Sequence, residues 1–263
     1  MARFVSLYSG SSGNAFYVGG KDSGVLVDVG VSFKSLCDAL NSVDIPLENI
    51  KALFVTHEHS DHIKGIDTFL KHLSVPVYAS KETVSYITHN SDIPTSSTFI
   101  ELSQHGVDVA DMFVTPFDTP HDSLHSLGFK FHTSDDRTVA LATDLGHINE
   151  NILKNLCSND LVVIESNYDC DMLKYGPYPY YLKKRISSPI GHLSNTDCSS
   201  SFSSLIYSGV TRISLVHLSE KNNRPEIALA YADSALSEIG CKRGRDCIID
   251  IAPRFQPGKM MIF

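Results

Sequence analysis

The sequence has no long hydrophobic run, because none of its apolar stretches approaches the roughly 20 residues that span a bilayer. Residues 1–4 lack the basic stretch and the apolar core of a signal peptide. No low-complexity segment, Pro/Gly linker or block of like charges divides the chain. These absences argue against a membrane protein. We expect one domain over residues 1–263, without a membrane partner, in the cytoplasm.

The cysteines form no CxxC pair, so the sequence lacks the spacing of a zinc ribbon. Scattered thiols in a cytoplasmic protein are mostly reduced and buried. We therefore expect free, buried thiols at Cys37, Cys157, Cys170, Cys198, Cys241 and Cys247.

Basic residues are outnumbered by acidic ones: 22 Lys and Arg against 30 Asp and Glu give a net charge of −8 with neutral histidines. This balance argues against a protein that coats nucleic acid through bulk electrostatics. It leaves room for an enzyme that grips a few phosphates at a metal site, because two divalent ions would add about +4 there.

Short apolar runs rich in Val, Ile and Phe alternate with helical patterns along the chain. The expected strands are 4–8, 15–18, 25–29, 52–56, 76–79, 112–117, 128–133, 138–142, 161–165, 212–217 and 247–251. The expected helices are 33–42, 63–72, 81–88, 150–157, 180–186, 196–207 and 225–239. Two successive series of strands and helices predict an α/β sandwich, in which two sheets lie face to face with helices outside.

The most informative motif is His57-Glu58-His59-Ser60-Asp61-His62, which follows an expected strand and precedes an expected helix. Alternate residues of an extended chain point the same way, so His57 and His59 can converge on one ion. Where the chain turns into the helix, Asp61 and His62 project from a new direction and can serve a second ion. Such ligands suit zinc, iron or manganese. The alternative is a polar loop that holds three histidines by chance.

Three further candidates, His121, Asp144 and His217, also lie at expected strand ends. Active sites of α/β proteins gather there, because loops converge at strand ends. Each residue alone is more often structural or solvated. Together with the first motif, the three complete a set of seven metal ligands.

With these residues in this order, the sequence resembles the metallo-β-lactamase superfamily, and more closely its YycJ/WalJ branch of bacterial DNA exonucleases. The resemblance covers nearly the whole chain. Its other motifs are Ser9–Asn14, Pro120–Asp122, Ala142–Gly146, Glu165–Asn167, Gly191–Asn195 and His217–Asn223. Tyr168 stands where many relatives have histidine, and Ser123–Ser126 departs from the family pattern.

The resemblance implies an αββα four-layer sandwich, the metallo-β-lactamase fold, and a metal-dependent hydrolase. Its cofactors would be two divalent ions per chain, with zinc first and manganese or iron as alternatives. The implied ligands are His57, His59 and His121 for the first ion, Asp61, His62 and His217 for the second, and Asp144 as the bridge.

His192 lies in a Gly-His-Leu-Ser-Asn turn before an expected helix. An imidazole beside a helix N-terminus, together with free backbone N–H groups, could cradle a phosphate. The alternative is that Ser194 or Asn195 only caps the helix. Asp28 and Asp122 are candidates to hold ligand imidazoles by hydrogen bonds.

Other segments have two interpretations each. Ser9–Asn14 is a hairpin turn or a backbone placed close to the metal site. Lys183–Arg185, the only dense basic cluster, steers a phosphodiester backbone or is a solvated helix face. The tyrosines beside it stack on bases or pack against the domain: Tyr175, Tyr178, Tyr180 and Tyr181. Histidines that fit no ligand spacing, expected to be surface or structural, are His72, His89, His105, His132 and His147.

The resemblance therefore implies phosphodiester hydrolysis, with a DNA strand degraded from its 5′ end toward its 3′ end. A hydroxide held by two metals would attack phosphorus, Asp61 would orient it, and protonated His192 would favour the departing oxygen. A hydrolase of a small ester, thioester, lactam or cyclic phosphodiester would share every ligand. A di-iron oxidoreductase would need an electron-carrier domain or a flavin site, for which 263 residues leave little room. A non-catalytic regulatory module should lack ligands, and none is missing.

Overall fold

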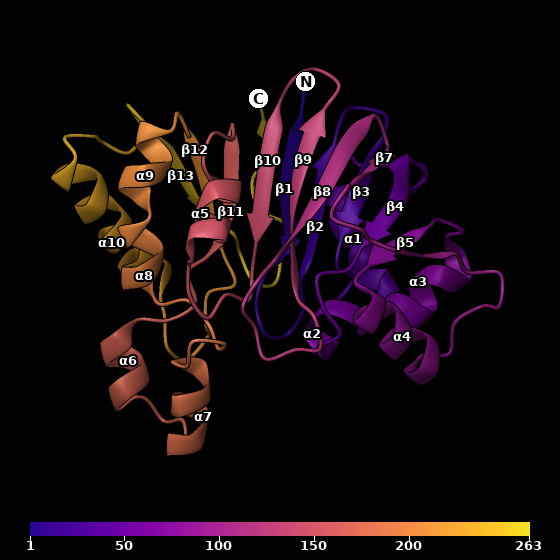
Figure 1. Ribbon diagram of the computed structural model, residues 1–263, viewed down its shortest axis with the longest axis horizontal. Helices are drawn as coiled ribbons and strands as arrows, with labels where there is room; N and C mark the ends of the chain where they lie inside the picture. Colours follow the sequence, from indigo (N-terminus) through magenta and orange to yellow (C-terminus); the bar gives the residue numbers. More distant parts are fainter. The chain divides into compact units, whose positions relative to one another are not determined.

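The computed structural model describes residues 1–263 and divides into two compact units. Unit 1 comprises Met1–Pro116, Ser123–Arg137 and Pro253–Phe263, and unit 2 comprises Phe117–Asp122 and Thr138–Ala252. Figure 1 shows the helices and strands of both. The single domain expected over residues 1–263 stays a prediction.

Unit 1 contains a seven-stranded sheet with the order β14-β1-β2-β3-β4-β5-β6. Its strands are β14 (Met261–Ile262), β1 (Arg3–Tyr8), β2 (Ala15–Gly19), β3 (Gly24–Val27), β4 (Ile50–Phe54), β5 (Val77–Ala79) and β6 (Phe99–Glu101). Neighbouring strands from β14 to β3 are antiparallel, whereas those from β3 to β6 are parallel. Since β3 and β4 are parallel, the residues that follow them come to the same edge of the sheet.

The remaining elements of unit 1 are α1 (Phe33–Ser42), the 3₁₀ turn η1 (Leu47–Asn49), α2 (Ser60–Ile63), α3 (Ile66–His72), α4 (Lys81–Asn90), β7 (Val107–Val109), most of β8 (Met112–Asp118) and β9 (Leu127–Thr133). The Ser32 hydroxyl caps α1 as expected, accepting from the Ser35 amide. The helix predicted over 63–72 is confirmed from Ile66 to His72, but Ile63 belongs to α2, and the chain breaks between α2 and α3. There the Gly65 amide donates to the Val29 carbonyl, and the space for a Cβ is filled by the Val31 backbone.

Unit 2 is built on four parallel strands, in which β10, β11, β12 and β13 are paired in sequence order. They are β10 (Thr138–Ala142), β11 (Leu161–Glu165), β12 (Arg212–Val216) and β13 (Ile248–Ile251). The helices are α5 (Glu150–Leu156), α6 (Cys170–Tyr175), α7 (Tyr180–Ile186), α8 (Asn195–Ser200), α9 (Phe202–Tyr207) and α10 (Pro225–Glu238). Strand β11 is buried at every position, as expected for a strand covered on both faces.

The helix predicted over 196–207 is confirmed except at Ser201, which separates α8 from α9. The Ser201 hydroxyl donates to the Cys198 carbonyl at 2.7 Å, and such serine bonds to the helix backbone compete with helical hydrogen bonding. The sequence patterns also missed the short elements α6, β6, β7, β14 and η1. They are too short to show a clear hydrophobic period.

All six cysteines are free. Cys198 and Cys247 are buried and three others are half-buried, but Cys170 is exposed, so the expectation of burial was wrong for that residue. None of the helices combines the length and the apolar character needed to cross a membrane.

Candidate metal centre

The histidine motif of unit 1 begins just after β4. His57 is fully buried, His59 precedes α2, and Asp61 and His62 lie within α2. The His57 ring centroid lies 4.6 Å from that of His59 and 4.1 Å from that of His62. The structure thus brings the three imidazoles of the motif together, as the spacing predicted.

Asp28 follows β3 and holds His62 in place, which confirms one of the two predicted supporting carboxylates. Its Oδ2 lies 2.7 Å from His62 Nδ1, and its Oδ1 accepts from the Thr56 amide at 2.8 Å. Burial raises the pKa of Asp28, although the bonds from His62 and Thr56 oppose that shift. An ionised carboxylate can only accept, so His62 Nδ1 carries the proton and Nε2 carries the lone pair that a metal requires.

The Ser9–Asn14 segment joins β1 to β2 and also lies against the histidine motif, so both of its interpretations apply. The Asn14 amide nitrogen donates to the Asp61 carbonyl at 2.8 Å, and its side-chain nitrogen lies 3.1 Å from His62 Nε2. Gly30 is required here, because a Cβ would collide with the Asp61 carbonyl. The Ser9–Asn14 segment therefore helps to position Asp61 and His62 within α2.

In unit 2, the residues after three parallel strands meet at one sheet edge around Glu165. Glu165 Oε1 lies 2.7 Å from His217 Nδ1 and 2.9 Å from His192 Nδ1, and its Oε2 accepts from the Leu145 amide at 2.7 Å. Asp144 Oδ1 lies 3.3 Å from His217 Nδ1 and 3.4 Å from His192 Nδ1. These four residues form a group whose donor atoms are close enough to hold one ion.

Glu165 received no role in the sequence interpretation, although its motif was noted. The available signal was its place at the end of the apolar run Leu161–Ile164, where a charged residue is rarely buried without a partner. Burial tends to raise the pKa of Glu165, but His192 and His217 lower it below its usual value. Burial likewise tends to lower the pKa of His192, and Glu165 and Asp144 raise it overall.

His121 lies three residues past β8 rather than at its end, which corrects the predicted position. Its Nδ1 lies 3.0 Å from the Gly191 carbonyl, which can only accept, so Nε2 again carries the lone pair. Nε2 lies 3.9 Å from Asp144 Oδ1, and burial lowers the pKa of His121. Asp122 Oδ1 lies 3.5 Å from His121 Nε2, and the same carboxylate forms a bidentate ion pair with Arg185.

Three of the backbone amides near His192, where the sequence predicted free N–H groups, have hydrogen-bond partners. The His192 amide donates to Ile186 O, the Leu193 amide to Glu165 Oε2, and the Asn195 amide to Tyr168 O. The Ser194 hydroxyl caps α8, which is the alternative considered above. The His192 side chain, in contrast, lies beside Glu165 and Asp144.

Three residues of these groups have left-handed backbones: Asp28 (φ 62°), Asp144 (φ 57°) and His217 (φ 55°). This conformation is uncommon outside glycine, and when present it often marks a functional position. Each follows a parallel strand, so a sharp turn there aims the side chain along the sheet edge.

The five histidines expected to be surface or structural are all exposed.

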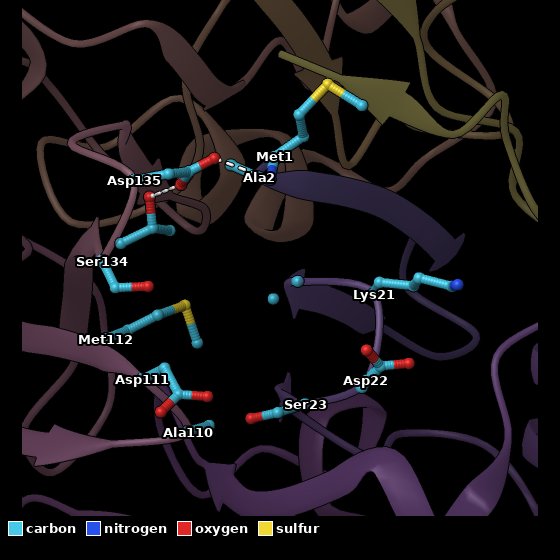
Figure 2. Close-up of a pocket in the computed structure, with 13 residues that line it drawn as sticks. Met1, Ala2, Lys21, Asp22, Ser23, Ala110, Asp111, Met112, Ser134 and Asp135 are labelled. Atoms are coloured by element: carbon cyan, nitrogen blue, oxygen red, sulfur yellow. Dashed lines mark hydrogen bonds and ion pairs between the residues drawn. The ribbon is translucent and has the colours of Figure 1, made fainter.

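Figure 2 shows a hollow in unit 1, and none of its lining residues belongs to the histidine motif. It is lined by Gly19–Ser23 between β2 and β3, and by Ala110–Met112 and Thr133–Asp135. The motif follows the carboxyl end of β4, whereas this hollow lies at the amino end of the parallel strand β3. It contains neither histidine nor cysteine.

The profile of the family described as the metallo-beta-lactamase superfamily matches residues 8–217, and with them all seven predicted ligands. The chain belongs to the metallo-β-lactamase superfamily. It is 34% identical to exodeoxyribonuclease YycJ of Bacillus anthracis over 90% of both chains. It is 31% identical to exodeoxyribonuclease WalJ of Streptococcus pneumoniae over 95% of this chain and 94% of that one. The predicted resemblance is confirmed.

The fold of this superfamily member is also confirmed by solved structures. The metallo-β-lactamase fold protein YhfI of Bacillus subtilis superposes with a TM-score of 0.73 over 99% of both chains, at 16% identity. The chain has the metallo-β-lactamase fold, with two mixed β-sheets flanked by helices. With this family and these exodeoxyribonuclease relatives, the chain is a metal-dependent hydrolase. Its His and Asp groups fit a divalent metal.

Proposed function

We propose that this protein is a metal-dependent phosphodiesterase, and more specifically a 5′-to-3′ exonuclease that degrades DNA in the cytoplasm. The observation that carries the proposal is the similarity to two exodeoxyribonucleases, at 34% and 31% identity over nine-tenths or more of the chain. The similarity extends far beyond the histidine motif common to the superfamily.

We propose two divalent ions per chain, zinc first and manganese or iron as alternatives, with the seven predicted residues as ligands. The donor chemistry fits, because the imidazoles of His62, His121 and His217 each bond through Nδ1 to a carboxylate or carbonyl. This leaves Nε2 as the ligand atom, which is the usual state of a metal-bound histidine. When bound, such ions supply an activated water and stabilise negative charge on a phosphoryl oxygen.

The chain's own residues contribute orientation and a proton. Asp61 is partly exposed, and its carboxylate would orient the attacking water by accepting a hydrogen bond. His192 donates from Nδ1 to Glu165, whose charge raises the pKa of His192 and favours the protonated ring. Its Nε2–H would then donate to the departing sugar oxygen, where negative charge develops.

The decisive experiment uses purified protein and strands labelled at either end, as single-stranded and duplex DNA and RNA, with each metal supplied in turn. We expect stepwise loss of nucleotides from the 5′ end of DNA. The control is the Asp144→Asn variant, which should be inactive. Cleavage of RNA alone would overturn the DNA assignment, and hydrolysis of small esters without any oligonucleotide cleavage would overturn the phosphodiesterase.

Metal stoichiometry tests the ligand set independently. Elemental analysis of gently purified protein should approach two equivalents of metal per chain. A single tightly bound ion, with Asp61 and His62 uncoordinated in a metal-saturated crystal, would contradict the proposed pair.

A further inference from the structure

Helices α6 and α7 form a projection from unit 2, residues 170–186, which lies beyond the ends of its parallel strands (Figure 1). A small hydrophobic cluster of its own, Tyr168, Leu173 and Ile186, holds it together, with Tyr178 and Leu182 packed against that cluster. The Lys183 ammonium group also donates to the Lys174 carbonyl at 2.8 Å and ties α7 to the end of α6. The projection is thus a packed structural element, and its surface residues have defined positions.

That surface carries exposed aromatic rings. Tyr175 is 75% exposed, Tyr180 81% and Tyr181 75%, and only Tyr207 elsewhere in the chain is an equally exposed tyrosine. Tyr178 differs, because it packs against the cluster. Exposed aromatic side chains gathered on one short segment mark a binding surface more often than isolated ones do.

The same segment is basic in an acidic protein. Residues 170–186 contain four Lys or Arg and one Asp, a net charge of 4 − 1 = +3, whereas the whole chain has −8. Lys174 lies over the Tyr175 ring, with its Nζ 5.0 Å from the centroid. Lys184 is exposed on α7. Aromatic faces interleaved with ammonium groups suit a ligand that presents both flat rings and negative charge.

The projection is also joined directly to the candidate catalytic residues of unit 2. The His192 amide donates to the Ile186 carbonyl at the end of α7, at 2.9 Å. Arg185, one residue earlier, pairs with Asp122 beside His121. Gly191 packs so closely on the end of α7 that a Cβ would collide with the Arg185 carbonyl. A chain bound along α7 would therefore lead to His192.

We propose that the α6–α7 projection binds the single-stranded part of a nucleic-acid substrate outside the reaction centre. Tyr175, Tyr180 and Tyr181 stack on unpaired bases, and Lys174 and Lys184 contact phosphates. A single strand is the matching occupant because every base offers a face for stacking and every linkage offers a charge. The inference rests on the proposed function, since it names how that substrate is held.

Direct binding tests the surface apart from catalysis. The metal-loaded protein is titrated into a fluorescein-labelled single-stranded phosphorothioate oligonucleotide, and anisotropy is followed. Replacing both Tyr180 and Tyr181 with alanine should weaken binding about 10- to 100-fold. The matched control is Tyr207→Ala, equally exposed on α9, which should bind like the wild type. Phenylalanine at both positions should restore binding, because it retains the stacking face.

Salt dependence tests the charged part. Lys184→Gln should lower the slope of log Kd against log salt by about 0.7, the value for one phosphate contact on a single strand. An unchanged slope would mean that Lys184 makes no phosphate contact.

Kinetics separate this inference from the proposed function. On an oligonucleotide, the double alanine variant should show a KM raised to a similar degree, whereas its rate on bis(p-nitrophenyl) phosphate should stay at the wild-type value. Oligonucleotide cleavage with binding and KM unchanged would overturn the inference and leave the proposed function standing. Tyrosine-dependent binding without cleavage would support the surface and overturn the nuclease. Tyrosine-dependent capture of anionic lipid vesicles in place of the oligonucleotide would overturn the surface assignment.

Discussion

The histidine groups of unit 1 and unit 2 are both oriented by a buried carboxylate, but the two carboxylates have different numbers of partners. In each, a fully buried carboxylate accepts from an imidazole Nδ1 at 2.7 Å: Asp28 for His62 and Glu165 for His217. Asp28 supports one histidine and is fixed by Thr56, whereas Glu165 also contacts His192 and accepts two backbone amides.

The two groups also differ in how the chain assembles them. The four donors of unit 1 lie within six consecutive residues, 57–62. Those of unit 2 come from separate segments near the ends of β8, β10, β11 and β12, and buried asparagines join the segments that follow β11 and β12. Asn223 Nδ2 donates to Ser166 O at 2.9 Å and to Asn167 O at 3.0 Å, and its side chain bonds with that of Asn195. The unit 2 group therefore depends on long-range contacts that the unit 1 group does not need.

The largest expected effect comes from Asp144, which contacts both His192 and His217. Asp144→Asn should lower kcat by at least about 10³-fold, because the neutral amide cannot serve as a bridging ligand. Asparagine tolerates the left-handed backbone at this position, so the fold should persist. The measurement is turnover at saturating metal with circular dichroism alongside. Asp136→Asn, also left-handed but exposed, is the control, and near-normal turnover of Asp144→Asn would end the bridge assignment.

His192→Ala should lower kcat on an oligonucleotide by about 10²–10³-fold, which is typical for loss of a general acid. Metal content should not change, because His192 is proposed to act on the departing oxygen. Paired kinetic and elemental measurements check both parts. His147→Ala, an exposed histidine on a neighbouring loop, should be silent. Loss of metal in His192→Ala would instead make the residue a ligand.

The two anchoring carboxylates give a direct test of the comparison. Glu165→Gln should weaken metal binding or activity by about 100-fold and Asp28→Asn by about 10-fold, the two ends of the usual range for such support. The larger effect is expected for Glu165 because it orients two imidazoles. Competition with a chromogenic chelator measures affinity in each variant. If both variants lose the same metal affinity, the contact of Glu165 with two imidazoles has no larger effect than the contact of Asp28 with one.

The smallest effect concerns stability alone. Asn223→Ala leaves buried acceptors without a donor and should lower the free energy of unfolding by about 3 kcal/mol. Asn151→Ala, an exposed change on α5, should stay within about 0.5 kcal/mol. Urea unfolding followed by circular dichroism gives both values. If Asn223→Ala is as mild as its control, the asparagine network does not hold the unit 2 segments.

Much of the fold followed from local patterns. Buried strands such as Leu161–Glu165 stand out as apolar runs, and α1 was located from its cap at Ser32. The helices predicted over 63–72 and 196–207 are interrupted at Gly65, whose amide donates to the distant Val29 carbonyl, and at Ser201, whose hydroxyl donates to the Cys198 carbonyl. A hydrophobic period does not register such contacts.

The sequence by itself determined the family, the candidate ligands and the geometry of residues 57–62, because alternation along an extended chain is a local property. Only the tertiary structure decided which groups support those ligands. It gave Glu165 its place between His192 and His217, paired Asp122 with Arg185, and used the backbone amides around His192. The physical reason is that a buried carboxylate is stabilised by partners that parallel strands bring together from far along the chain, and no local pattern specifies them.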